Sequence, residues 1–522
     1  MPSRIIRRIL AVPALLALAG CVMGPRYEQP TIDLPEEWPE HVLLSESDAA
    51  DWQLWWTRYN DPVLDELIAQ AMRDNLDIHL QTQRIQEARA RLGFSRADRM
   101  PTLNAQAEAM RQRQAGLTMP MPGAAVPGPS VLDQLVQIEQ GLQRLGQPAG
   151  PPPSSLELIR DGVNLLQDDT PSVGRGPTGN MFSVSAVLGY EVDLWGRLAR
   201  QQETAEALLD QSVFVHDAVR LHVIADVVTV YFNLRASQAQ LAITERTVEA
   251  RQETLRLQEV RRRGGDIDAL GVRQAEAQLE AAHALIPSQR ERVQLLQGAL
   301  GVLVGLTPAE LLAELELEDR AFDAIRLPDT VPSELPSEML RRRPDIRAAE
   351  AGIIATNAQI GAAQADRLPR LNLAAFLGTT ALDVGDLFSG PAETWGLSAS
   401  VAGPIVDFGR NRARVDVAEA QRDQADTQYR ITVVTAFREV RDALVSYDAA
   451  TERARAIHRQ AEAVRDALRL AEIRYDAGYI AFLEVLDAQR TLLDAELLIT
   501  EAERDRLLAT AALFKALGGG FS

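Results

Sequence analysis

The chain has 522 residues and a formal net charge of −19 at pH 7. This charge excludes the basic surface that nucleic-acid binding requires. Apolar residues make up 46% of the chain, which excludes a disordered protein, and aromatic residues only 5%, which argues against a thick globular core built from large rings.

Residues 1–20 predict an export signal, because three arginines precede an apolar run, Ile9 to Ala19, that is too short to span a membrane. The single cysteine, Cys21, follows directly, so no intramolecular disulfide can form. Leu18 to Cys21 reads Leu-Ala-Gly-Cys and resembles a lipobox, in which the cysteine is acylated once the signal is removed. Val22, in place of Asp, fits sorting to the outer membrane. The alternative is an ordinary buried cysteine behind the signal.

Two stretches, Arg197 to Arg263 and Arg410 to Ala477, contain neither Gly nor Pro. Each would reach roughly 100 Å as one helix. Both carry apolar residues three or four positions apart, which predicts a buried helical face: Leu221, Ile224, Val228 and Tyr231, then Tyr429, Val433, Phe437, Val440 and Leu444. A plain coiled-coil dimer would show the same pattern. Beyond Cys21 no window has the eighteen apolar residues of a helical membrane span.

An internal repeat organises the chain. Residues 97–104 match residues 365–372 at an offset of 268, and residues 195–197 match residues 408–410 at an offset of 213. The second offset also pairs Gly265 with Gly478. The sequence is therefore two copies of one unit, and the first copy has 55 extra residues between its paired motifs.

Four short segments with alternating apolar and small or polar residues predict β-strands: Leu103 to Ala109, Phe182 to Tyr190, Leu371 to Ala375 and Trp395 to Val401. Each copy is then expected to read helix, strand, turn, strand, very long helix, shorter helix. A strand of about ten residues suits a tilted membrane strand, although a half-buried soluble hairpin alternates too. Four strands cannot close a barrel, since about eight are needed, so membrane insertion would require oligomerisation. The extra residues lie between the strands of the first copy, within about 111–180, and this Pro- and Gly-rich segment predicts a long hairpin loop.

Further motifs are similar to those of the outer-membrane factor family, the TolC-like channels, and in particular of the lipoprotein branch that serves resistance-nodulation-division type multidrug efflux pumps. They run from Cys21 to the C-terminus: Cys21 to Pro30, Trp55-Trp56, Asp61 to Leu64, Asn75 to Ile78, Tyr190 to Arg197, Arg342 to Glu350, Leu483 to Arg490 and Ala516 to Gly520. The long first hairpin loop departs from the family pattern.

The resemblance implies a mainly α protein with membrane β-strands. The expected assembly is a homotrimer whose 12-stranded β-barrel, four strands per chain, lies in the outer membrane and continues as a long α-helical periplasmic barrel. Along the chain, it implies a signal peptide (1–20), a lipidated N-terminal segment (21–60), a first repeat (61–306), an equatorial segment (307–340) and a second repeat (341–522).

By the same resemblance, the protein is a passive exit duct for drugs or other small toxic compounds, lipid-anchored at Cys21. Its partners would be a periplasmic adaptor, an inner-membrane pump and outer-membrane lipid. Leu483 and Asp487 match the family's periplasmic gate, where three copies would form an apolar and an acidic ring. The expected adaptor-docking turns contain Arg261, Gly264, Gly265, Arg474, Tyr475 and Gly478, where Gly permits the tight turn and Arg can also cap the preceding helix.

No pattern in the sequence predicts an enzyme. The six histidines include no pair at the i, i+4 spacing of metal ligands, and no cofactor motif is recognisable. We therefore expect no catalytic residues, no metal and no cofactor. Two alternatives stay open: a TolC-like exit duct for protein secretion, and a structural periplasmic coiled-coil lipoprotein without a pore.

Overall fold

The computed structural model describes residues 22–33, 35, 44–45, 54–113, 178–312, 322–327, 331–332 and 340–519. Cys21, the export signal and most of the hairpin-loop insert lie outside these ranges. Contacts group the chain into two units. One is mainly helical (Met1–Met100, Glu191–Leu371 and Val401–Ser522), and the other contains most of the strands (Pro101–Tyr190 and Asn372–Ser400).

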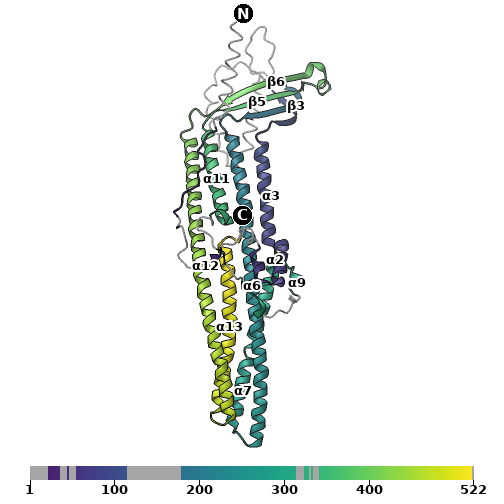
Figure 1. Ribbon diagram of the computed structural model, residues 1–522. Helices are drawn as coiled ribbons and strands as arrows, with labels where there is room; N and C mark the ends of the chain where they lie inside the picture. The colour runs from purple at the N-terminus through teal and green to yellow at the C-terminus, as the bar shows by residue number, and fades with distance from the viewer. Residues whose placement is uncertain are drawn as a thin grey trace, which may run out of the picture. The chain divides into compact units, whose positions relative to one another are not determined.

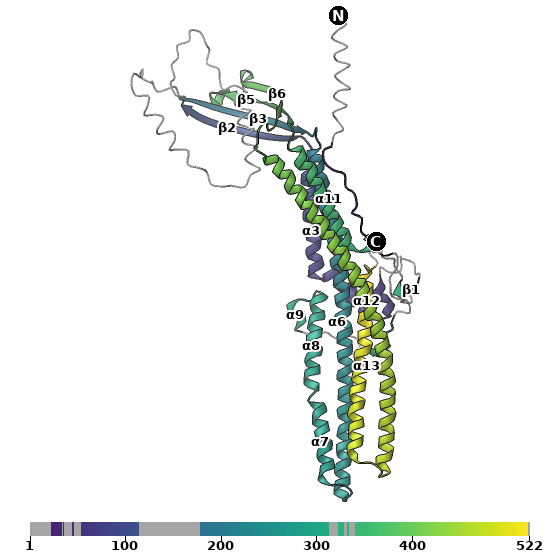
Figure 2. The same ribbon diagram turned by 90° about the vertical axis from the view of Figure 1, so that its left-hand side faces the viewer.

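The helical unit repeats one set of helices. In the first copy these are α2 (Pro62–Asp74), α3 (Leu76–Ala97), α6 (Arg197–Gly264), α7 (Ala269–His283) and α8 (Ile286–Leu303). In the second they are α11 (Pro344–Ala365), α12 (Arg410–Asp476) and α13 (Phe482–Ala516). Figures 1 and 2 show α13 lying between α12 and α6, and α7 and α8 following one another along α6.

The two offsets found in the sequence hold in the structure. The ends of α3 and α11 are 268 positions apart, and the starts of α6 and α12 are 213 positions apart. The copies differ in one helix, because α13 is continuous whereas its counterpart is divided into α7 and α8 at Ala284 and Leu285. Pro287 follows this break and lacks the amide that would continue the helical hydrogen bonds. The prediction of one shorter helix per copy is therefore correct only for the second copy.

Glycines in the left-handed region limit the long helices. Gly196 (φ +75°) precedes α6, Gly265 (φ +85°) follows it, and Gly409 (φ +88°) precedes α12. Only glycine adopts this conformation without a steric cost. Because α6 contains neither glycine nor proline before its last residue, Gly264, and α12 contains none at all, the two helices run for 68 and 67 residues.

Strands β2 (Thr102–Arg113), β3 (Thr178–Val192), β5 (Arg370–Ala381) and β6 (Glu393–Ala402) form one sheet in the order β2-β3-β5-β6. β2 and β3 are antiparallel, with Leu103 opposite Leu188 and Ala107 opposite Val184. This register puts the predicted apolar positions of both strands on one face. The sheet therefore joins the two copies through β3 and β5 and leaves β2 and β6 as its edges.

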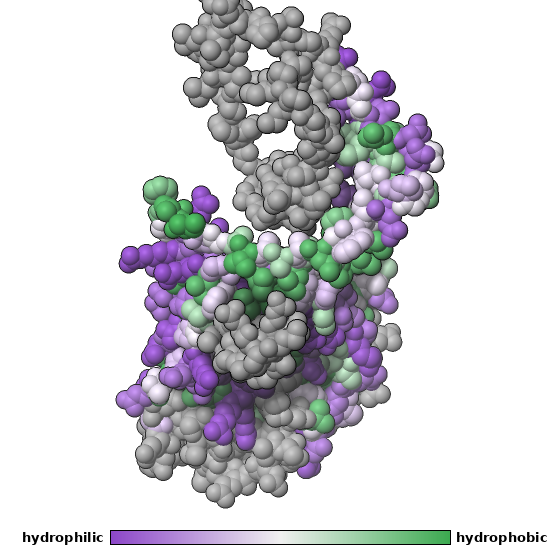
Figure 3. Space-filling view, turned by 90° about the horizontal axis from the view of Figure 1, so that it is seen from above, coloured by the Kyte–Doolittle hydropathy of each residue, from purple (hydrophilic) through white to green (hydrophobic). Residues whose placement is uncertain are grey.

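The strands expose apolar side chains to an unusual degree: Leu103, Val184, Leu188, Leu373, Leu377, Trp395, Leu397 and Val401. The view from above shows hydrophobic patches among the strands, whereas hydrophilic residues dominate the surface of the helices (Figure 3). Water disfavours so large an apolar surface, so this face requires lipid or another protein. Within the described ranges, no helix combines the length and the apolar character that crossing a membrane would require.

Four aromatic rings meet in one core of the helical unit. Trp55, in the 3₁₀ helix η2 (Trp55–Tyr59), stacks on Phe514 at 5.3 Å, and Tyr59 meets Phe232 edge-on at 4.9 Å between ring centroids. These four rings are fully buried. A low aromatic content therefore does not prevent a local aromatic core where the four rings meet.

Three further short elements belong to the helical unit. β1 (Leu44–Ser45) pairs in parallel with β4 (Val331–Pro332), and α9 (Pro308–Leu311) begins with a capping box.

Candidate functional site

The turn between α6 and α7 is the first of two helix-hairpin tips. The amide of Gly265 donates to the carbonyl of Arg262, and the amide of Asp266 donates to the carbonyl of Arg261, both at 3.0 Å. This pattern is that of a Schellman motif, in which a residue with positive φ closes the helix. Gly264 is the last residue of α6. The sequence prediction of a tight glycine turn is therefore correct, and the left-handed position is Gly265.

The turn between α12 and α13 is the second tip. Gly478 has φ +77°, its amide donates to the carbonyl of Tyr475 at 2.9 Å, and the amide of Tyr479 donates to the carbonyl of Arg474 at 2.8 Å. A Cβ atom at Gly478 would meet nothing within 4 Å. Its backbone conformation, rather than crowding, therefore favours glycine here.

The two tips contact each other through three side chains. Arg261 Nη2 lies 3.2 Å from Asp476 Oδ1, and the Arg261 guanidinium lies 5.3 Å from the centre of the Tyr475 ring. The hydrogen bond that Arg261 donates to Asp476, followed by its hydrogen bond with Tyr475, raises the pKa of Arg261. Both Arg261 and Asp476 are partly exposed, so we expect this ion pair to contribute less than about 1 kcal/mol.

At the first tip, Arg261 pairs with the other tip, whereas Arg263 Nε donates to the carbonyl of Glu259 at 3.4 Å, in the last turn of its own helix. Arg474, on the second tip, is exposed. Two partners of Tyr475 escaped the sequence analysis: Gln258 donates to its hydroxyl at 3.4 Å, and the ring of Phe482 lies 5.4 Å away. These contacts bridge positions up to 217 apart, which no local pattern reveals.

Leu483 and Asp487 lie at the start of α13, one helical turn apart, and both side chains are exposed. Leu483 is 60% exposed, whereas Val485 and Leu486 between the two are buried. Asp487 Oδ1 pairs with Arg490 Nη2 at 2.6 Å, three residues further on. The sequence pattern predicted the role of Asp487 but not its pairing with Arg490. An acidic ring built from three copies would therefore carry an arginine beside each carboxylate.

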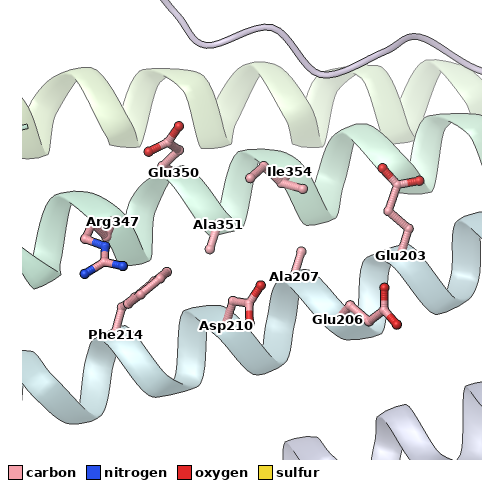
Figure 4. A pocket seen from close by; sticks show the side chains of 9 residues that line it. All are labelled: Glu203, Glu206, Ala207, Asp210, Phe214, Arg347, Glu350, Ala351 and Ile354. Atoms are coloured by element: carbon pink, nitrogen blue, oxygen red, sulfur yellow. The ribbon is translucent and has the colours of Figure 1, made fainter. Parts of the chain in front are cut away.

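A cleft of about 420 Å³ opens between α6 and α11 (Figure 4). Glu206 and Asp210 line it from α6, and the Arg347 guanidinium lies over the Phe214 ring at 4.2 Å. Burial, with a smaller effect of Glu206, raises the pKa of Asp210. The side chains of Gln202 and Arg96 lower the pKa of Glu206, against an opposing effect of burial. None of the lining residues is a Ser, Cys or His, so the cleft offers no nucleophile for acyl transfer.

No group of three or more His, Cys, Asp or Glu side chains is placed to hold a metal ion in the part of the chain that the structure describes. Cys21, the expected acylation site, lies outside that part. The residues of the two tips and of the expected gate all lie within that part. These residues form two glycine turns, two exposed ion pairs and an exposed apolar side chain at Leu483.

An open-edged sheet with an exposed apolar face, together with paired helices of 67 and 68 residues that end in glycine turns, defines a TolC-like outer-membrane channel fold. The family model for outer membrane efflux proteins matches residues 163–306 and 335–519. The chain therefore belongs to the outer membrane efflux protein family.

Individual relatives are similar to this chain along almost its whole length. Outer membrane protein OprJ of Pseudomonas aeruginosa is 30% identical, over 98% of this chain and 96% of its own. The probable efflux pump outer membrane protein TtgC of Pseudomonas putida is 31% identical, over 98% and 95%. Among solved structures, the open state of the Neisseria gonorrhoeae MtrE outer membrane channel is similar with a TM-score of 0.76 and 27% identity, covering 96% and 99% of the two chains. The protein is an outer-membrane efflux channel.

Proposed function

We propose that three copies of this chain form the exit duct of a tripartite efflux system for drugs or other small toxic compounds, joined to an inner-membrane pump through a periplasmic adaptor. The observation that carries the proposal is the four-stranded sheet, which has an exposed apolar face and two free edges, β2 and β6. Unpaired strand edges are costly in lipid, and pairing β6 of one copy with β2 of the next removes all of them at once.

The names of the relatives support the proposal that the cargo consists of small apolar and toxic compounds. They include a toluene efflux pump, an antibiotic efflux pump and a solvent efflux pump outer membrane protein. A duct of this kind performs no chemical step on its cargo. The energy and the choice of substrate then belong to the pump. Acylation of Cys21 would hold each subunit on the outer membrane, because each methylene of a buried acyl chain contributes about 0.8 kcal/mol.

The purified protein tests the assembly directly. We expect a homotrimer in detergent by multi-angle light scattering and stepwise conductance in planar bilayers. Mass spectrometry of the N-terminal peptide would show the acyl groups separately. A monomer, or a trimer that conducts no ions, would contradict the duct.

Docking of the adaptor at the tips predicts a specific effect of Gly478. Asn tolerates the left-handed region better than other side chains do, so Gly478→Asn should keep the turn while adding a side chain at the tip. We expect this variant to remain trimeric and to lower drug resistance at least about tenfold when the cognate adaptor and pump are present, since a contact worth about 1.4 kcal/mol changes binding tenfold.

Gly409→Asn is the matched control for Gly478→Asn. Gly409 has φ +88°, a Cβ there would meet nothing within 4 Å, and the residue precedes α12 rather than following it. The control should retain full resistance. Full resistance of Gly478→Asn itself would contradict docking at this turn.

A further inference from the structure

The segment that directly follows Cys21 lies along the helical unit in an extended conformation. Residues 22–33 contain no helix or strand, and Figure 2 shows this purple segment descending beside α11. We call residues 22–30 the strap. Extended segments without partners in secondary structure leave their backbone groups to find other hydrogen bonds.

A buried arginine binds the carbonyl groups of the strap. Arg200, on α6, is only 8% exposed. Its Nε donates to the carbonyl of Met23 at 2.9 Å, and its Nη2 lies 3.4 Å and 3.3 Å from the carbonyls of Gly24 and Pro25. Its remaining nitrogen, Nη1, pairs with Glu203 at 2.7 Å. A guanidinium has five N–H donors and is costly to bury without acceptors, so the strap supplies what this arginine needs.

Further hydrogen bonds fix the strap at both ends. The amide of Met23 donates to the carbonyl of Trp195 at 3.0 Å, directly at the junction between β3 and α6. Asn357, on α11, donates to the carbonyl of Pro25 at 3.1 Å. The hydroxyl of Tyr27 donates to Glu350 at 2.8 Å, beside the acidic cleft. The contacts therefore define one register of the strap along α6 and α11.

Glycines allow the strap to lie close against α6 and α11. A Cβ at Gly24 would lie 2.4 Å from Gly361 Cα, and a Cβ at Gly361 would lie 2.6 Å from the Met23 carbonyl oxygen. A Cβ at Gly196 would lie 2.8 to 3.1 Å from atoms of Val22. Side chains at these positions would push the strap away from the helices. The groove is thus shaped for this segment of backbone.

The internal repeat supplies an independent comparison. The counterparts of Gly196 and Gly361 are Gly409 and Gly93, and a Cβ at either would meet nothing within 4 Å. The residue equivalent to Arg200 is Ala413. The residue equivalent to Asn357 is Arg89. Both glycines are therefore present in each copy, whereas the side chains that bind the strap occur in only one.

We propose that the strap is an intramolecular ligand of the α6–α11 groove and that it fixes the acylated end of the chain at the junction between β3 and α6, with Arg200 and Gly361 as positioning residues. Val22 contacts Gly196, and consecutive Cα atoms are about 3.8 Å apart, so acyl chains on the preceding residue would enter the membrane next to this junction. Each lipid anchor then belongs to a fixed point on its subunit. This membrane role rests on the proposed acylation of Cys21, whereas docking of the strap does not.

Trypsin cleavage after Arg26 tests the docking, because Arg26 is an exposed residue of the strap and proteases need a locally detached segment. The full-length trimer in detergent is digested, and mass spectrometry follows the release of the peptide that ends at Arg26. We expect Gly361→Ala and Arg200→Ala to accelerate this release about tenfold or more, which corresponds to a loss of about 1.4 kcal/mol in docking. Gly93→Ala is the matched control and should cleave at the wild-type rate.

Trimer content and bilayer conductance of each variant show that the rest of the molecule is intact. Equal cleavage of wild type, Gly361→Ala and Gly93→Ala would overturn the proposal. The mass of the released peptide reports acylation independently. Slow release of an unmodified peptide from the wild type, with rapid release from Gly361→Ala, would remove the lipid anchor but uphold the docked strap.

Discussion

Asp487 has its counter-ion three residues further along the same helix, and this pairing changes what a ring of such residues can do. Three isolated carboxylates would repel one another and favour cations. With Arg490 at 2.6 Å from each, the local charge is close to balanced. The constriction that we propose therefore depends more on the size of Leu483, which is 60% exposed, than on net charge.

Removing both side chains of the proposed gate should widen it. We expect Leu483→Ala combined with Asp487→Ala to raise single-channel conductance in planar bilayers by roughly twofold or more, because pore conductance depends on the radius of the narrowest ring. Leu270→Ala is the control, since Leu270 is the repeat counterpart of Leu483 and is 61% exposed at the start of α7. An unchanged conductance, or an equal rise in the control, would count against the gate.

Among the elements, α12 is a helix of 67 residues whose first turn is bound by one side chain, that of Asp407. Asp407 accepts hydrogen bonds from the amides of Gly409 at 3.1 Å and Asn411 at 3.0 Å. Asp193 performs the same task for α6 by accepting from the amide of Ala199 at 2.8 Å. These carboxylates satisfy amides that a helix N-terminus leaves without intrahelical partners.

The amides of Asn411 and Gly409 lower the pKa of Asp407, which gives a pH-dependent prediction. A carboxylate with a lower pKa in the folded than in the unfolded protein stabilises the fold above its unfolded pKa of about 3.9 and loses that effect as the pH falls through the folded pKa. Asp407→Ala should therefore weaken hydrogen-exchange protection of the first turn of α12 at pH 7. In strongly acidic solution wild type and variant should converge.

Asp407→Asn separates charge from hydrogen bonding, because its side-chain oxygen still accepts from an amide. We expect protection between that of wild type and Asp407→Ala at neutral pH, without the wild-type dependence on acid. Wild-type protection in Asp407→Ala at pH 7 would show that Asp407 does not cap α12.

For the whole molecule, the internal repeat indicates which surface contacts a neighbouring subunit. Leu221 and Phe232 of α6 are buried inside the chain, yet their counterparts on α12, Val434 and Val445, are 64% and 49% exposed. Equivalent helices in a closed ring have equivalent neighbours. The contacts that α6 makes with α11 inside one chain therefore predict those that α12 makes with α3 of a second copy in the proposed trimer.

One contact inside the chain predicts a pair of residues that can be cross-linked between subunits. Thr204 Oγ1 lies 3.4 Å from the Ala355 carbonyl oxygen, and the counterparts of these residues are Val417 and Glu87. The double variant Val417→Cys with Glu87→Cys should form disulfide-linked oligomers of the trimeric protein under mild oxidation, since helices this close place suitable pairs within disulfide reach. Non-reducing electrophoresis measures the product.

Asp416→Cys with Glu87→Cys is the geometric control, because Asp416 is rotated by about 100° from Val417 around α12. The single variants Val417→Cys and Glu87→Cys, oxidised in the same way, show whether either new cysteine pairs with Cys21 instead. Equal cross-linking of the two double variants would show that the repeat does not predict the subunit contact.

The sequence by itself determined the long helices, the repeat and the strand faces. Without Gly or Pro between residues 197 and 263, nothing interrupts the helical hydrogen bonds, and alternation along Leu103 to Ala109 fixes which side chains share a face. The sequence also located both glycine turns, because glycine adopts positive φ without a steric cost. Such features depend on neighbours within a few positions, which is why they can be predicted from local patterns.

Only the tertiary structure decided which distant groups meet. Arg261 pairs with Asp476 rather than with its own helix, and Arg200 binds a strap that lies about 175 positions earlier in the chain. In the local sequence, nothing distinguishes these arginines and their partners from ordinary polar surface residues. Hydrogen bonds and ion pairs depend on distance and direction in space, so they become visible once helices from both copies lie side by side.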